Sequence, residues 1–244
     1  MFSLLKKEVS TFLNSLTGYI SIWVFLITIG LFMWVFSGAG FNVLDAGYAS
    51  IDSLFVITPW VYMFLIPAIT MRLFSEERKT GTIELLLTKP LTELQIILAK
   101  YFAGVLLVLF SLLPTLVYFY TVYDYALPQG NVDTGAIIGS YIGLFLLGAA
   151  FVAIGLFASS LTDNQVIAFI IALFFCFFCY AGFESVSSIL PPGPVSVLAL
   201  QLGINTHYSS ISRGVIDTRD VVYYISLIGF FIMLTKLKLE SRKW

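Results

Sequence analysis

The sequence predicts an all-α polytopic membrane protein with six transmembrane helices, an N-terminal interfacial helix and a short cytoplasmic helix between the second and third spans. Only 11% of its 244 residues are charged and 59% are hydrophobic, whereas soluble domains carry about 25% charged residues. Long apolar stretches recur along the chain, and each could cross the roughly 30 Å hydrocarbon core of a bilayer. The basic residues gather in a few segments, as they do in membrane proteins of fixed orientation.

Residues 1–17 have an amphipathic pattern. Apolar residues recur at helical spacing, at Leu5, Val9, Phe12 and Leu16, which predicts a helix lying in the membrane interface. The first span follows at about residues 19–36. The small residues 37–40 also allow a cleaved signal peptide, but the apolar run exceeds the roughly 7–15 residues of such a segment. We therefore expect a retained membrane helix.

The second and third spans both contain proline. The second, about residues 54–71, holds Pro59 and Pro67, which predict a kink that could be a hinge or ordinary helix packing. Residues 92–95 (TELQ) form a T-x-x-Q capping box, which predicts a helix start before the third span at about 101–120. Pro114 lies in this span, and tyrosines at its far end predict an interfacial belt: Tyr118, Tyr120, Tyr123 and Tyr125.

The fourth span, about residues 135–161, is rich in small residues. Gly135, Gly139 and Gly143 make two overlapping G-x-x-x-G steps, which allow close helix packing either within the chain or across a dimer. A second capping box at residues 162–165 (TDNQ) predicts the start of the fifth span, about residues 165–183.

A long connection, residues 184–220, precedes the last span. It contains Pro191, Pro192, Gly193 and Pro194, followed by an apolar stretch that is too short to cross a bilayer. This stretch predicts a re-entrant or interfacial piece. The sixth span, about residues 221–235, is followed by basic residues Lys236, Lys238, Arg242 and Lys243.

The positions of the basic residues predict the orientation. With six spans, only Arg213 and Arg219 fall on one side, and the other Lys and Arg residues fall on the opposite side. Because basic residues favour the cytoplasm, both termini should be cytoplasmic. We expect one transmembrane domain over residues 1–244, inserted in a bacterial inner membrane among its lipids.

The segment from Arg72 to Lys100 is the longest charged stretch of the chain. Its bases are Arg72, Arg78, Lys79, Lys89 and Lys100, and its acids are Glu76, Glu77, Glu84 and Glu93. Within it, residues 82–88 predict a short amphipathic helix that Gly81 precedes and Pro90 stops, with Ile83, Leu86 and Leu87 on one face. This pattern favours a docking element that receives force from another protein. A solvated membrane-proximal loop is the alternative.

Several kinds of chemistry lack the residues that they need. The centres of the six spans hold no Asp, Glu, Lys, Arg or His, which argues against ion-coupled transport. His207 is the only histidine, and a role in loop packing or at the surface is expected for it. Cys176 and Cys179 lie in an apolar run and should pack against lipid or neighbouring helices. We expect no metal, no cofactor and, with a net charge of -1, no nucleic acid partner. No phosphate-binding loop occurs, so any ATP hydrolysis must occur in a partner.

Residues 77–90 (ERKTGTIELLLTKP) resemble the motif that joins the second and third helices of ABC-2 type transporter permeases. Residues 213–226 (RGVIDTRDVVYYIS) are similar to the family's lead-in to its last helix. Within the family, the chain most resembles the permease subunit of the gliding-motility-associated ABC transporter of Bacteroidetes-type bacteria. Permeases of copper-processing and multidrug systems are close alternatives.

The resemblance implies an alternating-access permease of the exporter kind, built from two permease chains and two ATP-binding cassette subunits. The cytoplasmic helix would be a coupling helix, and the motif assigns docking to the ATPase to Glu76, Glu77, Arg78, Gly81, Thr82 and Glu84. The second and fifth spans would line the cleft, and the loop at residues 191–204, including Pro191, Pro192, Gly193 and Pro194, would gate it from outside. Two alternatives are a structural scaffold of a motility or secretion machine and a membrane enzyme using His207, Glu184 and Asp217.

Overall fold

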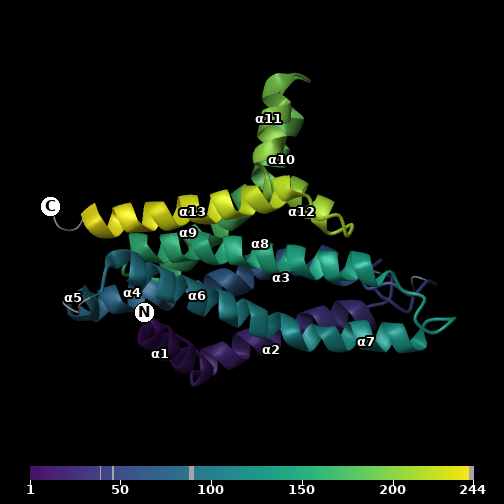
Figure 1. Cartoon of the computed structure of the whole chain (residues 1–244), viewed down its shortest axis with the longest axis horizontal. Helices are drawn as coiled ribbons and strands as arrows, with labels where there is room; N and C mark the ends of the chain where they lie inside the picture. The colour runs from purple at the N-terminus through teal and green to yellow at the C-terminus, as the bar shows by residue number, and fades with distance from the viewer. Residues whose placement is uncertain (39, 46, 88–90, 242–244) are drawn as a thin grey trace.

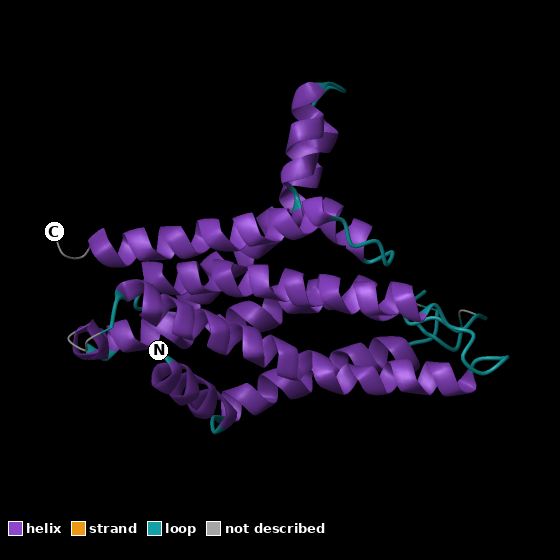
Figure 2. Cartoon of the chain, viewed as in Figure 1, coloured by secondary structure: helices purple, strands orange, loops and turns teal. Residues whose placement is uncertain are grey.

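The computed structural model describes residues 1–38, 40–45, 47–87 and 91–241. Every regular element among them is a helix, and most of the helices pack side by side in an elongated bundle (Figures 1 and 2). Within the described residues, five helices are long and apolar enough to cross a membrane, and a bent pair near the N-terminus makes a sixth if it counts as one span. The chain is therefore an all-α polytopic membrane protein.

The N-terminal helix α1 (Phe2–Leu13) packs against the third span. It ends earlier than predicted because Ser15 caps the next helix, its hydroxyl oxygen accepting a hydrogen bond from the Gly18 amide at 3.1 Å. Helix α2 (Leu16–Trp34) therefore includes Leu16. The prediction that Leu16 belongs to the apolar face of the first helix was wrong, and its side chain is 75% exposed.

The second span is helix α3 (Asp52–Thr70), which continues through Met71 into α4 (Arg72–Lys79). Both predicted prolines lie inside α3. Proline has no amide hydrogen for the carbonyl four residues earlier, so Pro59 leaves the carbonyl of Phe55 without its helical donor. The Tyr208 hydroxyl donates to this carbonyl at 2.7 Å instead. A distant side chain thus replaces the hydrogen bond that the proline removes.

The third span is longer than predicted. Helix α6 (Glu93–Leu112) begins at the predicted capping box, with reciprocal hydrogen bonds between Thr92 and Gln95. Pro114 lies in a single 3-10 turn, η1 (Leu113–Thr115), and α7 (Leu116–Tyr125) completes the span. The turn accommodates proline without ending the helix, so the span continues to Tyr125, beyond its predicted end at about residue 120.

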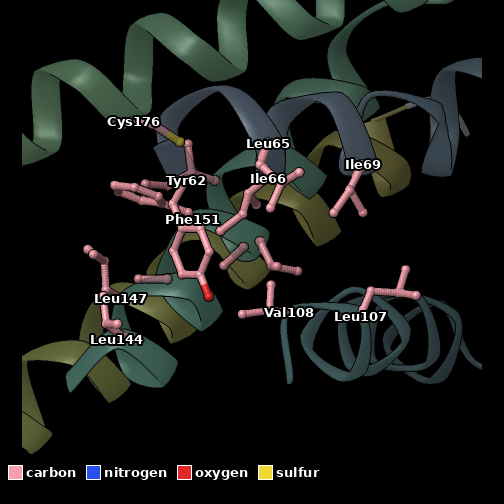
Figure 3. Close-up of a cluster of buried hydrophobic side chains, with 14 of the residues drawn as sticks. Tyr62, Leu65, Ile66, Ile69, Leu107, Val108, Leu144, Leu147, Phe151 and Cys176 are labelled. Atoms are coloured by element: carbon pink, nitrogen blue, oxygen red, sulfur yellow. The ribbon is translucent and has the colours of Figure 1, made fainter. Parts of the chain in front are cut away.

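Helix α8 (Thr134–Leu161) matches the predicted fourth span and lies at the centre of the bundle (Figure 1). Its small residues allow close packing within the chain. A Cβ atom at Gly143 would come within 2.9 Å of Ile211, and one at Gly155 within 2.0 Å of the Thr70 hydroxyl oxygen. Large side chains fill the remaining space around α8 (Figure 3): Tyr62, Leu65, Ile66, Ile69, Leu107, Val108, Leu144, Leu147 and Phe151.

The fifth span begins with α9 (Gln165–Phe177) and passes through a π-helical turn, η2 (Phe178–Gly182), into α10 (Phe183–Ile189). The predicted capping box at residues 162–165 was wrong. Asn164 caps α9 by accepting from the Val166 amide at 2.9 Å, and Thr162 instead accepts from the Asn164 amide. An Asn carbonyl reaches the first amides of the helix, so a cap three residues before Gln165 is not needed.

The predicted long connection after the fifth span is mostly helical. Helices α10 and α11 (Pro194–Leu202) form a hairpin that stands away from the bundle (Figure 1). Its apolar side chains are largely exposed, with Ile189 at 84% and Val195 at 65%. Neither helix of the hairpin could cross a bilayer alone, which agrees with a re-entrant or interfacial position.

Helix α12 (Ile204–Ile211) packs against α8 and the last span, α13 (Thr218–Glu240), which extends beyond the predicted range at both ends. Asp217 caps α13 by accepting from the Arg219 amide at 3.0 Å, and this hydrogen bond lowers the pKa of Asp217. At one end of the bundle lie α1, α4 and the last turn of α13, and at the other lie the end of α7 and the start of α8 (Figure 1).

Candidate functional site

The charged segment between the second and third spans forms two short helices joined by a sharp turn. Helix α4 ends at Lys79, and α5 (Thr82–Leu87) follows. Gly81 lies between them with φ +69°, and a Cβ atom there would meet nothing within 4 Å. Backbone conformation and not space therefore requires glycine at this turn. Thr88, Lys89 and the predicted stop at Pro90 lie outside the described residues.

Ser159, a fully buried residue near the end of α8, attaches α4 to the centre of the bundle. Its hydroxyl oxygen accepts from the amides of Phe74 and Ser75 at 2.9 and 3.1 Å, and its hydrogen is donated to the Met71 carbonyl at 3.0 Å. The Arg78 guanidinium also donates to the carbonyl of Ser160. Hydrogen bonds thus link both ends of α4 to the last turns of α8.

Lys100 attaches the same helix to two further elements. Its ammonium nitrogen lies 2.9 Å from a Glu77 oxygen and 3.0 Å from a Glu8 oxygen, and 5.3 Å from the centre of the Phe74 ring. The side chain is 1% exposed. A buried ammonium costs several kcal/mol unless it is paired, and two carboxylates pair this one. The triad of Glu8, Glu77 and Lys100 joins α1, α4 and α6.

The sequence pattern groups Lys100 with the bases of the charged docking segment, and the structure separates it from them. It lies in the second turn of the third-span helix and is buried. Hydropathy counts every lysine as polar and so places it outside the span. Two glutamates from other helices make its burial favourable, and no residue near Lys100 in sequence signals their approach.

The six predicted docking residues divide into two groups. Gly81, Thr82 and Glu84 are exposed to solvent on the turn and the first turn of α5. Glu77 and Arg78 point inward to Lys100 and Ser160, and Glu76 pairs with Arg72 at 3.1 Å while remaining 47% exposed. Docking by these residues stays a prediction, and their positions suit direct contact for the first group only.

The apolar face predicted for the short helix is partly engaged already. Ile83 is 4% exposed within the chain itself. The side chains of Leu86 and Leu87 lie outside the described residues. Ile83 therefore holds α5 to its own chain, and the exposed residues Thr82 and Glu84 flank it on the helix.

The predicted gate residues form the tip of the α10–α11 hairpin. Pro191, Pro192 and Pro194 are exposed, and Gly193 is half-buried. Ser196 stabilises this tip because its hydroxyl accepts from the Gly193 amide at 3.2 Å and donates to the Gly193 carbonyl at 2.8 Å. Their gating role stays a prediction.

His207 fastens the base of this hairpin to α12 and α13. One ring nitrogen lies 2.7 Å from Asp220 Oδ1 and the other 2.9 Å from the Gln201 carbonyl oxygen, and the ring stacks on Tyr223 with 3.9 Å between centroids. A protonated imidazolium donates to both acceptors, whereas a neutral ring donates to one. The residue is 8% exposed, so the expected surface role was wrong and the packing role is the one observed.

The described residues offer no group of three or more potential ligands for a metal ion. Cys176 and Cys179 are free and buried, so they face neighbouring helices and not lipid. His207, Glu184 and Asp217, named for the enzyme alternative, do not form one site. Asp220 pairs with His207, Glu184 accepts from Asn205 at 2.8 Å, and Asp217 caps α13.

The chain was compared with known protein families and with curated protein sequences. The family described as ABC-2 family transporter protein matches residues 45–235, which include the second to sixth spans, the charged segment and the hairpin. No curated protein sequence matches the chain.

Proposed function

Because this chain belongs to the ABC-2 family of transporter proteins, we propose that it is a permease subunit that changes conformation when a separate ATPase pushes on α5. As a family member it is a membrane-spanning component of an ABC transporter. Hydrolysis of ATP belongs to the partner. The proposal concerns how force enters this chain and where it goes.

The arrangement of α4 and α5 carries the proposal. Helix α5 presents exposed Glu84 at one end of the bundle, and it is joined through Gly81 to α4. Helix α4 continues the second span and is held to α8 by Ser159 and to α6 and α1 by Lys100. A push on α5 therefore acts on a body that includes parts of three spans, which is what a coupling helix requires.

We propose that two permease chains enclose the substrate pathway and alternate between inward-facing and outward-facing states. The second and fifth spans would line the cleft. This role is supported by the exposed apolar side chains that α3 and α9 present, including Trp60, Phe64, Ile170 and Phe174. The hairpin tip at residues 191–194 would gate the outer end.

We propose further that the complex is an exporter in a bacterial inner membrane, with α1, α5 and both termini in the cytoplasm. The distribution of basic residues supports this orientation. Within the family, the resemblance of the chain to the permease subunit of the gliding-motility-associated transporter is the reason for proposing that role. Deleting the gene in a gliding bacterium tests that assignment, because gliding should stop while growth continues.

Charge reversal at Glu84 tests the coupling role. The chain would be purified from membranes in mild detergent together with the chains that accompany it, and their ATP hydrolysis would be measured. We expect Glu84→Arg to lose the ATPase partner, because an exposed charge is reversed where contact is proposed. Asp124→Arg, a matched reversal at the opposite end of the bundle, should retain the partner.

Three outcomes would contradict the proposal. The first is retention of a fully stimulated ATPase by Glu84→Arg. The second is equal loss of the ATPase in both variants, which would indicate general instability. The third is purification of the unaltered chain without any ATPase, which would favour the structural scaffold.

A further inference from the structure

A shallow groove of about 400 Å³ runs between α1 and α6 on the outside of the bundle. Its residues come almost entirely from α1 and its cap, with one from the third span: Leu5, Lys6, Val9, Ser10, Leu13, Asn14 and Leu106. The groove takes no part in the coupling contacts described above. It lies on the opposite side of α1 from Glu8, which points toward Lys100.

Two adjacent stripes on α1 give the groove an amphipathic lining. Leu5, Val9 and Leu13 repeat every four residues and are half-buried. Lys6, Ser10 and Asn14 repeat at the same interval, one position later, and are exposed. Residues four apart lie on the same face of a helix, so an apolar wall runs alongside a row of hydrogen-bond donors.

The apolar side of the groove opens toward the lipid-facing surface of α6. Leu106 forms its wall there, and the neighbouring side chains of Phe102, Leu109 and Phe110 are exposed on the same spanning helix. In a transmembrane helix these side chains meet acyl chains. An apolar chain can therefore enter the groove directly from the bilayer.

The polar side of the groove is positively charged. Lys6 is exposed, and no ion pair forms between it and any residue that the structure describes. The one acid of α1, Glu8, is only 13% exposed and is paired with Lys100. Asn14 donates to the Ser10 oxygen at 3.1 Å, which leaves the Ser10 hydroxyl hydrogen to donate outward. Ammonium, hydroxyl and amide hydrogens together match a phosphate group with negative charge.

We propose that this groove binds one anionic phospholipid, with the phosphate at Lys6, Ser10 and Asn14 and an acyl chain along Leu5, Val9, Leu13 and Leu106. The positive charge of Lys6 on the polar side of the groove selects an anionic headgroup. The apolar side of the groove favours a headgroup that carries an acyl chain. Binding here fastens α1 to α6 from the lipid side, beside the attachment that Lys100 makes inside.

The test uses the full chain purified in detergent and measured by native mass spectrometry with phosphatidylglycerol or phosphatidylcholine added. We expect one phosphatidylglycerol to be retained in preference to phosphatidylcholine. Lys6→Gln should weaken this retention about fivefold, which corresponds to about 1 kcal/mol for one lysine near a membrane surface. Val9→Trp should also weaken it by filling the groove.

Lys7→Gln is the matched control, because it removes the same charge from α1 at a residue that does not line the groove. It should retain phosphatidylglycerol as the unaltered chain does. Equal losses in Lys6→Gln and Lys7→Gln would overturn the proposal in favour of diffuse surface attraction. Absence of any preference in the unaltered chain, or unchanged retention in Lys6→Gln and Val9→Trp, would also overturn it.

Discussion

The hydroxyl of Tyr208 donates to the carbonyl of Phe55 at 2.7 Å, across 153 residues of sequence. Phe55 is four residues before Pro59, so its carbonyl is the one that the proline deprives of a helical donor. The contact fastens α12, at the base of the α10–α11 hairpin, to the second span. A proline inside a membrane helix is thus made tolerable by a side chain from another helix.

Tyr208→Phe should destabilise the chain by about 1 kcal/mol, within the range for hydrogen bonds between membrane helices. In a Pro59→Ala background the same change should cost much less, because the alanine amide then serves the Phe55 carbonyl. The free energy of unfolding by detergent titration measures both. Tyr120→Phe, at a residue that is 65% exposed, should have no effect. An equal loss of unfolding free energy for Tyr208→Phe in both backgrounds would refute the idea that the Tyr208 hydroxyl replaces the amide donor that Pro59 lacks.

Gly155→Ala should separate the central helix from the second span. Its Cβ atom would lie 2.0 Å from the hydroxyl oxygen of Thr70, a residue that is fully buried. Overpacking of this kind costs about 1–3 kcal/mol, measured as a lower free energy of unfolding. At Gly229 of α13 an added Cβ meets nothing within 4 Å, so Gly229→Ala should be neutral or stabilising. A neutral Gly155→Ala would show that α8 is free to move there.

Lys100→Met should leave two partly buried carboxylates, of Glu8 and Glu77, without their shared partner. Breaking a buried ion pair from one side costs about 3–5 kcal/mol, and the unfolding free energy should fall accordingly. Adding Glu8→Gln and Glu77→Gln to Lys100→Met should restore much of the stability, because no unpaired charge then remains. The exposed Lys79→Met serves as control and should change little. Failure of the two glutamine changes to rescue would contradict the charge argument.

His207→Phe should loosen the base of the α10–α11 hairpin. Phenylalanine keeps the stack on Tyr223 but removes the hydrogen bonds to Asp220 and Gln201, which leaves a buried carboxylate unpaired. Amide hydrogen exchange in α11 and α12 should become faster. Asn205→Ala removes an exposed hydrogen bond to Glu184 nearby and should leave exchange almost unchanged. Equal exchange rates in the two variants would argue against the role of His207.

Local patterns in the sequence predicted much of the fold. The capping box at Thr92 and Gln95 and the limits of the fourth span depend on residues close together in the chain, and both agree with the structure. The predicted helix limits were wrong where a second residue nearby could serve as the helix cap. Asn164 could cap α9 as well as Thr162 could, and Ser15 could end the first helix before Leu16.

The candidate site was predictable in position but not in its contacts. The charged composition of residues 72–100 and the glycine turn predicted an exposed element there, and Glu84 is exposed as that element requires. The inward direction of Glu77 and Arg78 was not predictable, because helical spacing does not say which face meets α6 and α8.

By itself, then, the sequence determined that the chain lies in a membrane, roughly where it crosses, and where the charged segment of residues 72–100 lies. Hydropathy and helix capping determine these features, and both depend on residues close together in the chain. Only the tertiary structure decided that Lys100 is buried, that Gly143 and Gly155 of α8 serve packing within the chain, and that Tyr208 completes the second span. Each of these features depends on contacts between residues that are distant in sequence and meet only when the helices pack. Lys100 with Glu8 and Glu77 is one example.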